Sequence, residues 1–60
     1  MAKYNVLVVE DDAQLRRTLV EVFERCEYQV EESVDGLDAL EKVRQKRPDL
    51  VMMDVNMPRL

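Results

Sequence analysis

Val6-Leu7-Val8-Val9-Glu10-Asp11-Asp12 is the stretch that decides the expected fold of this 60-residue chain, because a short apolar run passes directly into three consecutive acids. The β-branched run at residues 6–9 is typical of a strand that is buried on both faces. Asp12 is a candidate N-cap, and a helical pattern follows it as far as about Cys26. This junction of strand and helix indicates the beginning of an α/β protein.

The apolar residues of the first predicted helix gather on one side of a helical wheel drawn at about 100° per residue. The stripe consists of Leu15, Leu19, Val22, Phe23 and Cys26. A stripe of this width is typical of a helix that faces a core. Val20 lies off the stripe and is expected to be exposed, whereas the thiol of Cys26 is expected to be buried and unreactive.

A second helix is predicted after the Asp35-Gly36 turn. Asp35 is placed to cap it, and Pro48 stops it. Its apolar side consists of Leu37, Ala39, Leu40 and Val43. We expect this side to face the core.

The two remaining strand patterns differ in polarity. Residues 28–32 alternate, with Tyr28 and Val30 pointing inward, as in an edge strand with one solvated face. Leu50-Val51-Met52-Met53 is apolar throughout and predicts a second strand that is buried on both faces. The alternation of strands and helices predicts a parallel sheet with right-handed crossovers, in the strand order 2-1-3. This βαβαβ arrangement is how a doubly wound α/β sheet begins.

Acidic residues follow both apolar strands. Glu10 and Asp11 come after the first, and Asp54 comes after the last. Neighbouring parallel strands end at the same edge of a sheet, where open α/β sheets bind ligands, so these carboxylates should converge. Converging carboxylates repel unless a cation lies between them, and oxygen ligands without His or Cys favour Mg²⁺ over zinc. The alternative is that these acids are solvated capping and loop residues. Acids after two neighbouring strands favour the site.

Composition excludes several classes of function. The chain has no His, one Gly and one Cys. These counts exclude Ser-His-Asp catalysis, the dinucleotide and P-loop fingerprints, an internal disulfide and a Cys-rich zinc site. A net charge of −4 argues against non-specific binding of nucleic acid. Because the chain has neither a membrane-length apolar run nor a signal-peptide pattern, a reducing, cytoplasmic location without membrane contact is expected.

Three segments together resemble the receiver domain of bacterial two-component response regulators. They are Val8-Val9-Glu10-Asp11-Asp12, Asp35-Gly36-Leu37-Asp38-Ala39-Leu40, and Pro48-Asp49-Leu50-Val51-Met52-Met53-Asp54-Val55-Asn56-Met57-Pro58. The resemblance spans essentially the whole chain. It implies that residues 1–60 form the N-terminal half of a CheY-like receiver domain, with a flavodoxin-like fold that runs from the first strand to the loop after the third.

The resemblance also implies roles for individual residues. Asp54 corresponds to the phosphoacceptor, which takes a phosphoryl group from the phosphohistidine of a histidine kinase. Glu10 and Asp11 correspond to the paired acids that hold Mg²⁺, with Asp11 bound directly and Glu10 directly or through water. Asn56 would offer its backbone carbonyl to the metal, and Asp12 is a less favoured ligand. Such a module accepts a phosphoryl group and is not an enzyme.

The chain departs from the family after its third predicted strand. A receiver domain has five strands and five helices, and its Ser or Thr on the fourth strand and Lys on the fifth have no counterpart here. Because the third predicted strand is apolar and lacks a neighbour on its far side, we expect a homodimer through this strand edge, formed by antiparallel pairing or by exchanged elements.

Two other functions compete with the phosphoacceptor. One is an excised or engineered half-domain that folds by self-association and has no phosphotransfer activity. The other is a Mg²⁺-dependent phosphohydrolase with an Asp nucleophile, which is disfavoured because Asp54-Val55-Asn56 contains no second acid and no general acid is evident.

Overall fold

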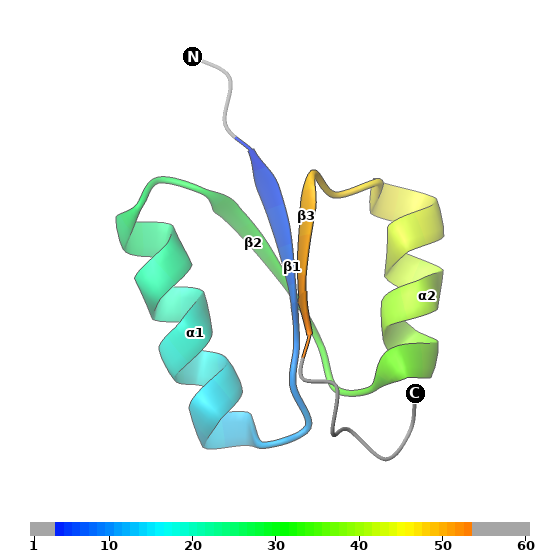
Figure 1. Cartoon of the computed structure of the whole chain (residues 1–60), viewed down its shortest axis with the longest axis horizontal. Coiled ribbons are helices and arrows are strands. Elements are labelled where there is room, and N and C mark those ends of the chain that lie inside the picture. The colour runs from blue at the N-terminus through cyan, green and yellow to red at the C-terminus, as the bar shows by residue number, and fades with distance from the viewer. Residues whose placement is uncertain (1–3, 54–60) are drawn as a thin grey trace.

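A computed structural model describes residues 4–53, which form three strands and two helices (Figure 1). In chain order the elements are β1 (Asn5–Val9), α1 (Ala13–Arg25), β2 (Gln29–Ser33), α2 (Gly36–Lys46) and β3 (Leu50–Met53). The strands form one parallel sheet in the order β2-β1-β3. The predicted α/β fold, the βαβαβ order and the strand order 2-1-3 are confirmed. Neither helix of residues 4–53 is long and apolar enough to cross a bilayer.

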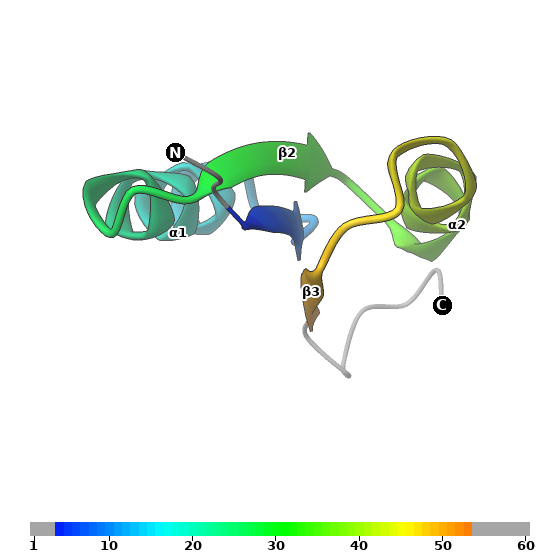
Figure 2. The ribbon, with the colours of Figure 1, turned by 90° about the horizontal axis from the view of Figure 1, so that it is seen from above.

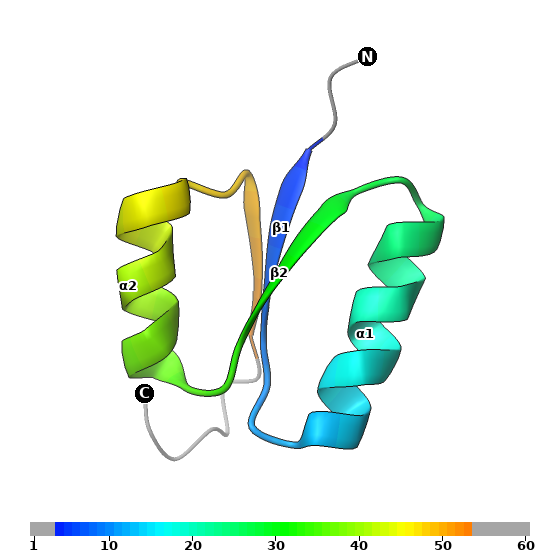
Figure 3. The same ribbon diagram turned by 180° about the vertical axis from the view of Figure 1, so that it is seen from behind.

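The central strand β1 is buried on both faces, as predicted. Figure 2 shows why, because α1 and α2 lie on opposite sides of the sheet, and Figure 3 shows the same arrangement from behind. Val6 and Val8 pack against the α1 side, whereas Leu7 and Val9 pack on the α2 side. An uninterrupted apolar run suits this position, since successive side chains of a strand alternate between its two faces.

Strand β2 is the edge strand that the alternating pattern predicts. Gln29 and Glu31 are exposed, whereas Val30 is half-buried on the α1 side of the sheet. Tyr28 packs on that same side and meets Phe23 of α1 edge-on, with the ring centroids 5.7 Å apart. The strand therefore has one wet face and one dry face.

Helix α1 buries a different side from the one predicted. Val20 exposes only 2% of its surface, whereas Leu15 and Val22 expose 46% and 50%. Leu19 and Phe23 join Val20 against the sheet. The apolar residues of α1 span about 160° of the wheel, and the members that pack lie toward one side of this arc, so the wheel alone cannot select the packed side. The prediction that Val20 is exposed is therefore wrong.

The end of α1 explains why the prediction of a buried Cys26 is also wrong. Cys26 is the C-cap residue and is exposed. Glu27 follows in the left-handed conformation, with φ of 70°. The N–H of Glu27 donates to Glu24 O at 3.0 Å, and that of Tyr28 donates to Phe23 O at 3.1 Å. These two bonds form a Schellman motif, which turns the chain out of the helix at Cys26.

Helix α2 is capped as predicted but buries little of its apolar side. The Asp35 carboxylate accepts a hydrogen bond from the N–H of Asp38 at 2.8 Å. Ala39 is buried against Leu7 and Val9, whereas Leu37 and Leu40 are exposed. The expectation that this whole side faces the core holds for Ala39 and fails for the two leucines and for Val43, which is also exposed.

Strand β3 is not buried on both faces, in contrast to the prediction. Leu50, Val51 and Met52 expose 49%, 39% and 39% of their surfaces, and only Met53 packs against the core of Leu7, Val9 and Ala39. The physical reason is that, within residues 4–53, β1 is the single strand paired with β3. The other edge of β3 has no partner strand in this part of the chain.

Candidate functional site

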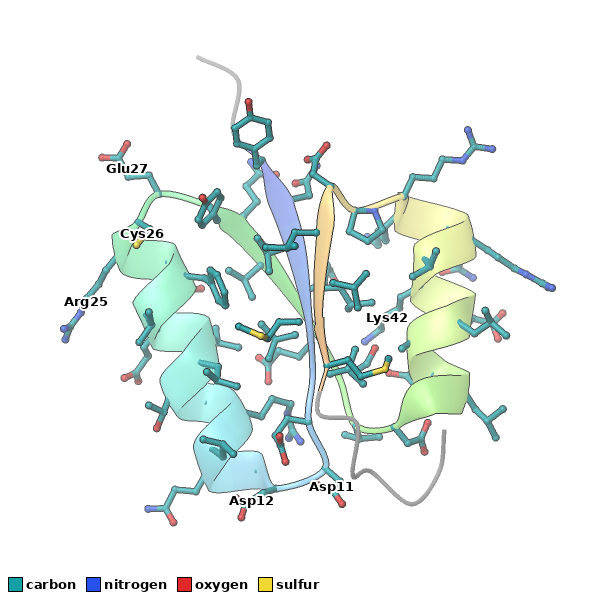
Figure 4. All side chains as sticks on the ribbon, in the orientation of Figure 1. Asp11, Asp12, Arg25, Cys26, Glu27 and Lys42 are labelled. Carbon is teal, nitrogen blue, oxygen red and sulfur yellow. The ribbon has the colours of Figure 1, made fainter. Side chains whose placement is uncertain are left out.

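The β1–α1 loop, residues 10–12, carries three acids at the carboxyl end of the sheet. In the register of the sheet, Val9 at the end of β1 pairs with Met53 at the end of β3. The two strands therefore end side by side, as the sequence predicts. Figure 4 shows Asp11 at this end of the molecule, opposite the end that carries Cys26.

Glu10 is the most restrained acid of the loop. It exposes 4% of its surface. Its N–H donates to Ser33 O at 3.0 Å, and its carbonyl accepts from Arg16 Nη1 at 2.8 Å. Its carboxylate atom Oε2 accepts from the N–H of Asp12 at 3.1 Å. Both its backbone groups and its side chain are thus held, which fixes where the carboxylate lies.

The other two acids of the loop have different surroundings. Asp12 is the N-cap of α1, and its Oδ1 atom accepts from the N–H of Gln14 at 2.9 Å and of Leu15 at 3.0 Å. The predicted capping role is confirmed, and it directs this carboxylate toward the helix. Asp11 is exposed and points away from the sheet into solvent in Figure 4. It is accessible to a ligand in solution.

The structure brings together part of the predicted site. Glu10 and Asp11 are neighbours in the loop, whereas Asp54, Asn56 and the loop at residues 57–58 lie outside the described residues. Within residues 4–53, no three Asp, Glu, His or Cys side chains are grouped closely enough to hold a metal ion. Convergence with Asp54 therefore stays a prediction.

The order of elements and the acids after β1 fit a known family. The response regulator receiver domain matches residues 6–60. The chain belongs to the response regulator receiver domain family. The predicted resemblance is confirmed, and the chain is a receiver domain of two-component response regulators over the matched residues.

Several curated relatives of this receiver domain carry named functions. Over 97% of its length the domain is 40% identical to sporulation initiation phosphotransferase F of Bacillus subtilis (strain 168), of which it covers 47%. It is 44% identical over 92% of its length to response regulator MprA of Mycobacterium sp. (strain KMS), covering 24%. It is 40% identical over 92% to protein-glutamate methylesterase/protein-glutamine glutaminase 1 of Anaeromyxobacter dehalogenans (strain 2CP-C), covering 16%. The receiver domain thus spans less than half the length of these relatives.

Arg16 is a residue of the site that sequence reasoning misses. Its Nη1 atom donates to the carbonyl of Glu10, and its Nε atom lies 3.1 Å from Oε1 of Glu32 on β2. The other oxygen of Glu32 pairs with Arg17 at 3.1 Å. One signal could have identified Arg16, because a cation in the first turns of a helix opposes the helix dipole and therefore suggests a specific partner.

A second polar group of the receiver domain lies where β2 ends and α2 begins. The hydroxyl of Ser33, which is buried and has no hydrogen bond of regular geometry within residues 4–53, is the main cause that holds the pKa of Asp38 below its ordinary value of 3.8. The ammonium of Lys42, 3.3 Å from Asp38 Oδ2, acts in the same direction. Lys42 also donates to the carbonyl of Glu32. Figure 4 shows Lys42 reaching from α2 toward the sheet.

A cavity of about 180 Å³ lies under α2. Its lining includes Asn5 and Gln29, the first residues of β1 and β2, together with Lys42 and Lys46. It therefore lies toward the amino ends of these strands. The acids of the β1–α1 loop follow the opposite ends, so this cavity is separate from the candidate site.

Proposed function

We propose that this receiver domain accepts a phosphoryl group on Asp54 from the phosphohistidine of a histidine kinase. Mg²⁺ would be held by Glu10, Asp11, Asp54 and the backbone carbonyl of Asn56. The observation that carries the proposal is the register of the sheet, in which Val9 pairs with Met53. Glu10 and Asp54 are the next residues along the chain after this pair. Such an edge is where open α/β sheets bind ligands.

The buried carboxylate of Glu10 supports a cation at this edge. Removing an ionised carboxylate from water is unfavourable unless charged or hydrogen-bonding partners replace the water. Within residues 4–53, the carboxylate of Glu10 accepts one hydrogen bond, from the neutral N–H of Asp12 to its Oε2 atom. The donor set of carboxylates and a carbonyl, with no His in the chain, fits Mg²⁺.

The chemistry that we propose is in-line phosphoryl transfer. A carboxylate oxygen of Asp54 forms a bond to phosphorus while the phosphorus–nitrogen bond of the donor breaks, and the bonding electron pair stays on the imidazole nitrogen. When bound, Mg²⁺ supplies positive charge that neutralises the phosphoryl oxygens. Asp54 is a phosphoacceptor here and not a residue of a turnover enzyme. The methylesterase activity in the name of one relative belongs to a protein of which this chain covers 16%.

Intact mass spectrometry tests the proposal directly. The 60-residue chain is incubated with Mg²⁺ and a small-molecule phosphodonor, with a chelated sample alongside. We expect a gain of one phosphoryl group that disappears in the chelated sample and in Asp54→Asn. Asp12→Asn is the matched control, because it removes one charge from the same loop but retains a good N-cap, and it should still be labelled.

Two results would contradict this function. Labelling that persists in Asp54→Asn would show that another group is the acceptor. No labelling of a chain that circular dichroism shows to be folded would favour the alternative, a half-domain that folds by self-association without phosphotransfer. Repeated turnover of a phosphate ester would instead indicate a phosphohydrolase.

We also propose that two copies of the 60-residue chain associate through the edge of β3 that has no partner strand within residues 4–53. The exposed side chains of Leu50, Val51 and Met52 support this, because an apolar strand with a free edge is a template for pairing with another chain. The association would take place in the cytoplasm, where the kinase partner acts. Neither a nucleic acid nor a membrane is part of this proposal.

Sedimentation equilibrium tests the association at micromolar concentration. We expect the mass of two chains for the wild type. Val51→Lys places a charge on the exposed strand and should shift the mass toward one chain. Val22→Lys, the same substitution at an exposed position of α1, serves as a control and should leave the dimer intact. A wild-type mass equal to one chain would contradict the dimer.

A further inference from the structure

The guanidinium of Arg16 joins the acidic loop to β2. It donates through Nη1 to the carbonyl of Glu10 at 2.8 Å and through Nε to Glu32 at 3.1 Å, and its side chain exposes only 17% of its surface. We propose that Arg16 is a positioning residue, which holds Glu10 in the place from which its carboxylate serves the metal. This inference rests on the proposed function, since it assumes that Glu10 and Asp11 bind Mg²⁺.

The restraint on Glu10 comes from β2 on two sides. Its N–H donates directly to Ser33 O at the end of β2. Its carbonyl accepts a hydrogen bond from Arg16, which in turn donates to Glu32, the residue before Ser33 on β2. Arginine suits this task because its planar fork of donors can hold two acceptors in one geometry, and charge-assisted hydrogen bonds are the stronger kind.

A positively charged side chain at the position of Arg16 is unfavourable unless a specific partner stabilises it. It lies in the first turns of α1, where the helix dipole disfavours positive charge. Arg17, the next residue, pairs with the same Glu32 carboxylate but is more exposed, and it forms no hydrogen bond with Glu10. Both arginines therefore pair with Glu32, but Arg16, unlike Arg17, also donates a hydrogen bond to the β1–α1 loop.

This pair provides a matched control. Arg16→Gln and Arg17→Gln each remove one positive charge close to the acidic loop, and each removes one partner of Glu32. Removing positive charge alone should strengthen the binding of a cation. If Arg16 positions Glu10, then Arg16→Gln should instead weaken the binding of Mg²⁺, because a displaced Glu10 carboxylate binds the metal less well.

Isothermal titration calorimetry with Mg²⁺ measures the difference on the 60-residue chain. We expect Arg16→Gln to weaken Mg²⁺ binding by about tenfold, the size typical of groups that orient metal ligands. Arg17→Gln should leave the dissociation constant unchanged or lower it by up to about twofold, because the charge term alone acts there. Circular dichroism of each variant reports whether it is folded.

A second measurement reports on the bond itself and applies even where Arg16→Gln is unfolded. Glu32→Gln keeps the shape of the partner but weakens the hold on Arg16. It is read by chemical shift and not by Mg²⁺ binding, because the loss of its negative charge would weaken Mg²⁺ binding without any displacement of Glu10. The amide nitrogen of Asp11 shares a peptide group with the Glu10 carbonyl. Its ¹⁵N chemical shift should therefore move in Arg16→Lys and in Glu32→Gln, and stay in place in Arg17→Gln.

The outcomes separate this inference from the proposed function. If the wild type binds Mg²⁺ and Arg16→Gln binds it equally well or better, Arg16 is not a positioning residue while the metal site stands. Equal weakening in Arg16→Gln and Arg17→Gln would also overturn the inference. A wild-type chain that binds no Mg²⁺ would overturn the metal site and the role of Arg16 together.

Discussion

The Oδ1 atom of Asp12 lies 3.0 Å from the backbone nitrogen of Leu15, and so the third acid of the β1–α1 loop belongs to α1. The two acids before it have other surroundings, one buried and one exposed. One run of three acids thus contains a restrained carboxylate, an accessible carboxylate and a helix cap. These different environments lead to separate expectations for variants of each residue.

Asp12→Ala should destabilise the fold by about 1 kcal/mol, because it leaves the first N–H groups of α1 without their acceptor. Asp12→Asn should cost much less, since Asn is an equally good N-cap. Urea denaturation of the two variants and the wild type measures both values. Equal losses in the two variants would show that the charge of Asp12, and not its cap, stabilises the fold.

Val20→Ala and Val22→Ala compare the same substitution on two sides of α1. Val20 is packed against Val6 and Val8, so its truncation should cost about 2 kcal/mol, whereas truncation of the exposed Val22 should cost less than about 0.5 kcal/mol. Thermal unfolding followed by circular dichroism measures the difference. The reverse order would mean that α1 packs with the side that the helical wheel favours.

Glu27→Gly should stabilise the fold by up to about 1 kcal/mol. Glu27 has φ of 70°, a left-handed conformation that a residue with a Cβ atom adopts at a cost and that Gly adopts freely. Glu24→Gly, inside α1, is the control and should destabilise by about 1 kcal/mol. A loss of stability in both variants would argue against the Schellman motif at the end of α1.

Asp38 should make stability depend on pH in the acidic range. Because the pKa of Asp38 is lower in the folded state than its ordinary value of 3.8, the unfolded state takes up the proton first as the pH falls. The stabilisation is therefore present above pH 3.8 and is lost as the pH falls through the lowered pKa.

Urea denaturation at several pH values checks this expectation against Asp38→Asn and Ser33→Ala. The wild type should be more stable than Asp38→Asn at pH 7, and the difference should shrink below pH 3.8. Ser33→Ala removes the main cause of the shift and should bring the pKa of Asp38 back toward its ordinary value. A difference between wild type and Asp38→Asn that is independent of pH would contradict this role of the carboxylate.

Asp11→Asn should raise the melting temperature in the absence of divalent cations, because it reduces repulsion between neighbouring carboxylates. The same variant should be stabilised less by added Mg²⁺ than the wild type. Differential scanning calorimetry with chelator and with Mg²⁺ measures both effects. An identical response to Mg²⁺ in the two proteins would count against Asp11 as a ligand.

Local chemistry explains which features of the fold are predictable from sequence. The apolar run at residues 6–9 can be stable only where both faces are covered, and that requirement places β1 in the centre of the sheet. The carboxylates of Asp12 and Asp35 accept hydrogen bonds from backbone N–H groups two or three residues further along the chain. Their capping roles therefore follow from their positions in the sequence. These predictions need no knowledge of distant partners.

Most of the errors and omissions concern contacts between distant elements. Val20 is buried because the sheet, and not the helical wheel, selects the packed side of α1. Cys26 is exposed for a local reason, since the helix ends there in a Schellman motif. The exposure of β3 depends on what lies beside it. Arg16 joins residues that are 6 and 16 positions away along the chain, a relationship that no local periodicity encodes.

The exposed thiol of Cys26 offers a single attachment point for a spectroscopic label, since the chain has one cysteine. The label would lie at the far end of α1 from Asp11 (Figure 4). Thirteen helical residues at about 1.5 Å each separate the two ends by about 20 Å. With Mn²⁺ in place of Mg²⁺, the interaction between the spin of a nitroxide on Cys26 and the spin of the ion would therefore measure the distance between the label and the bound metal.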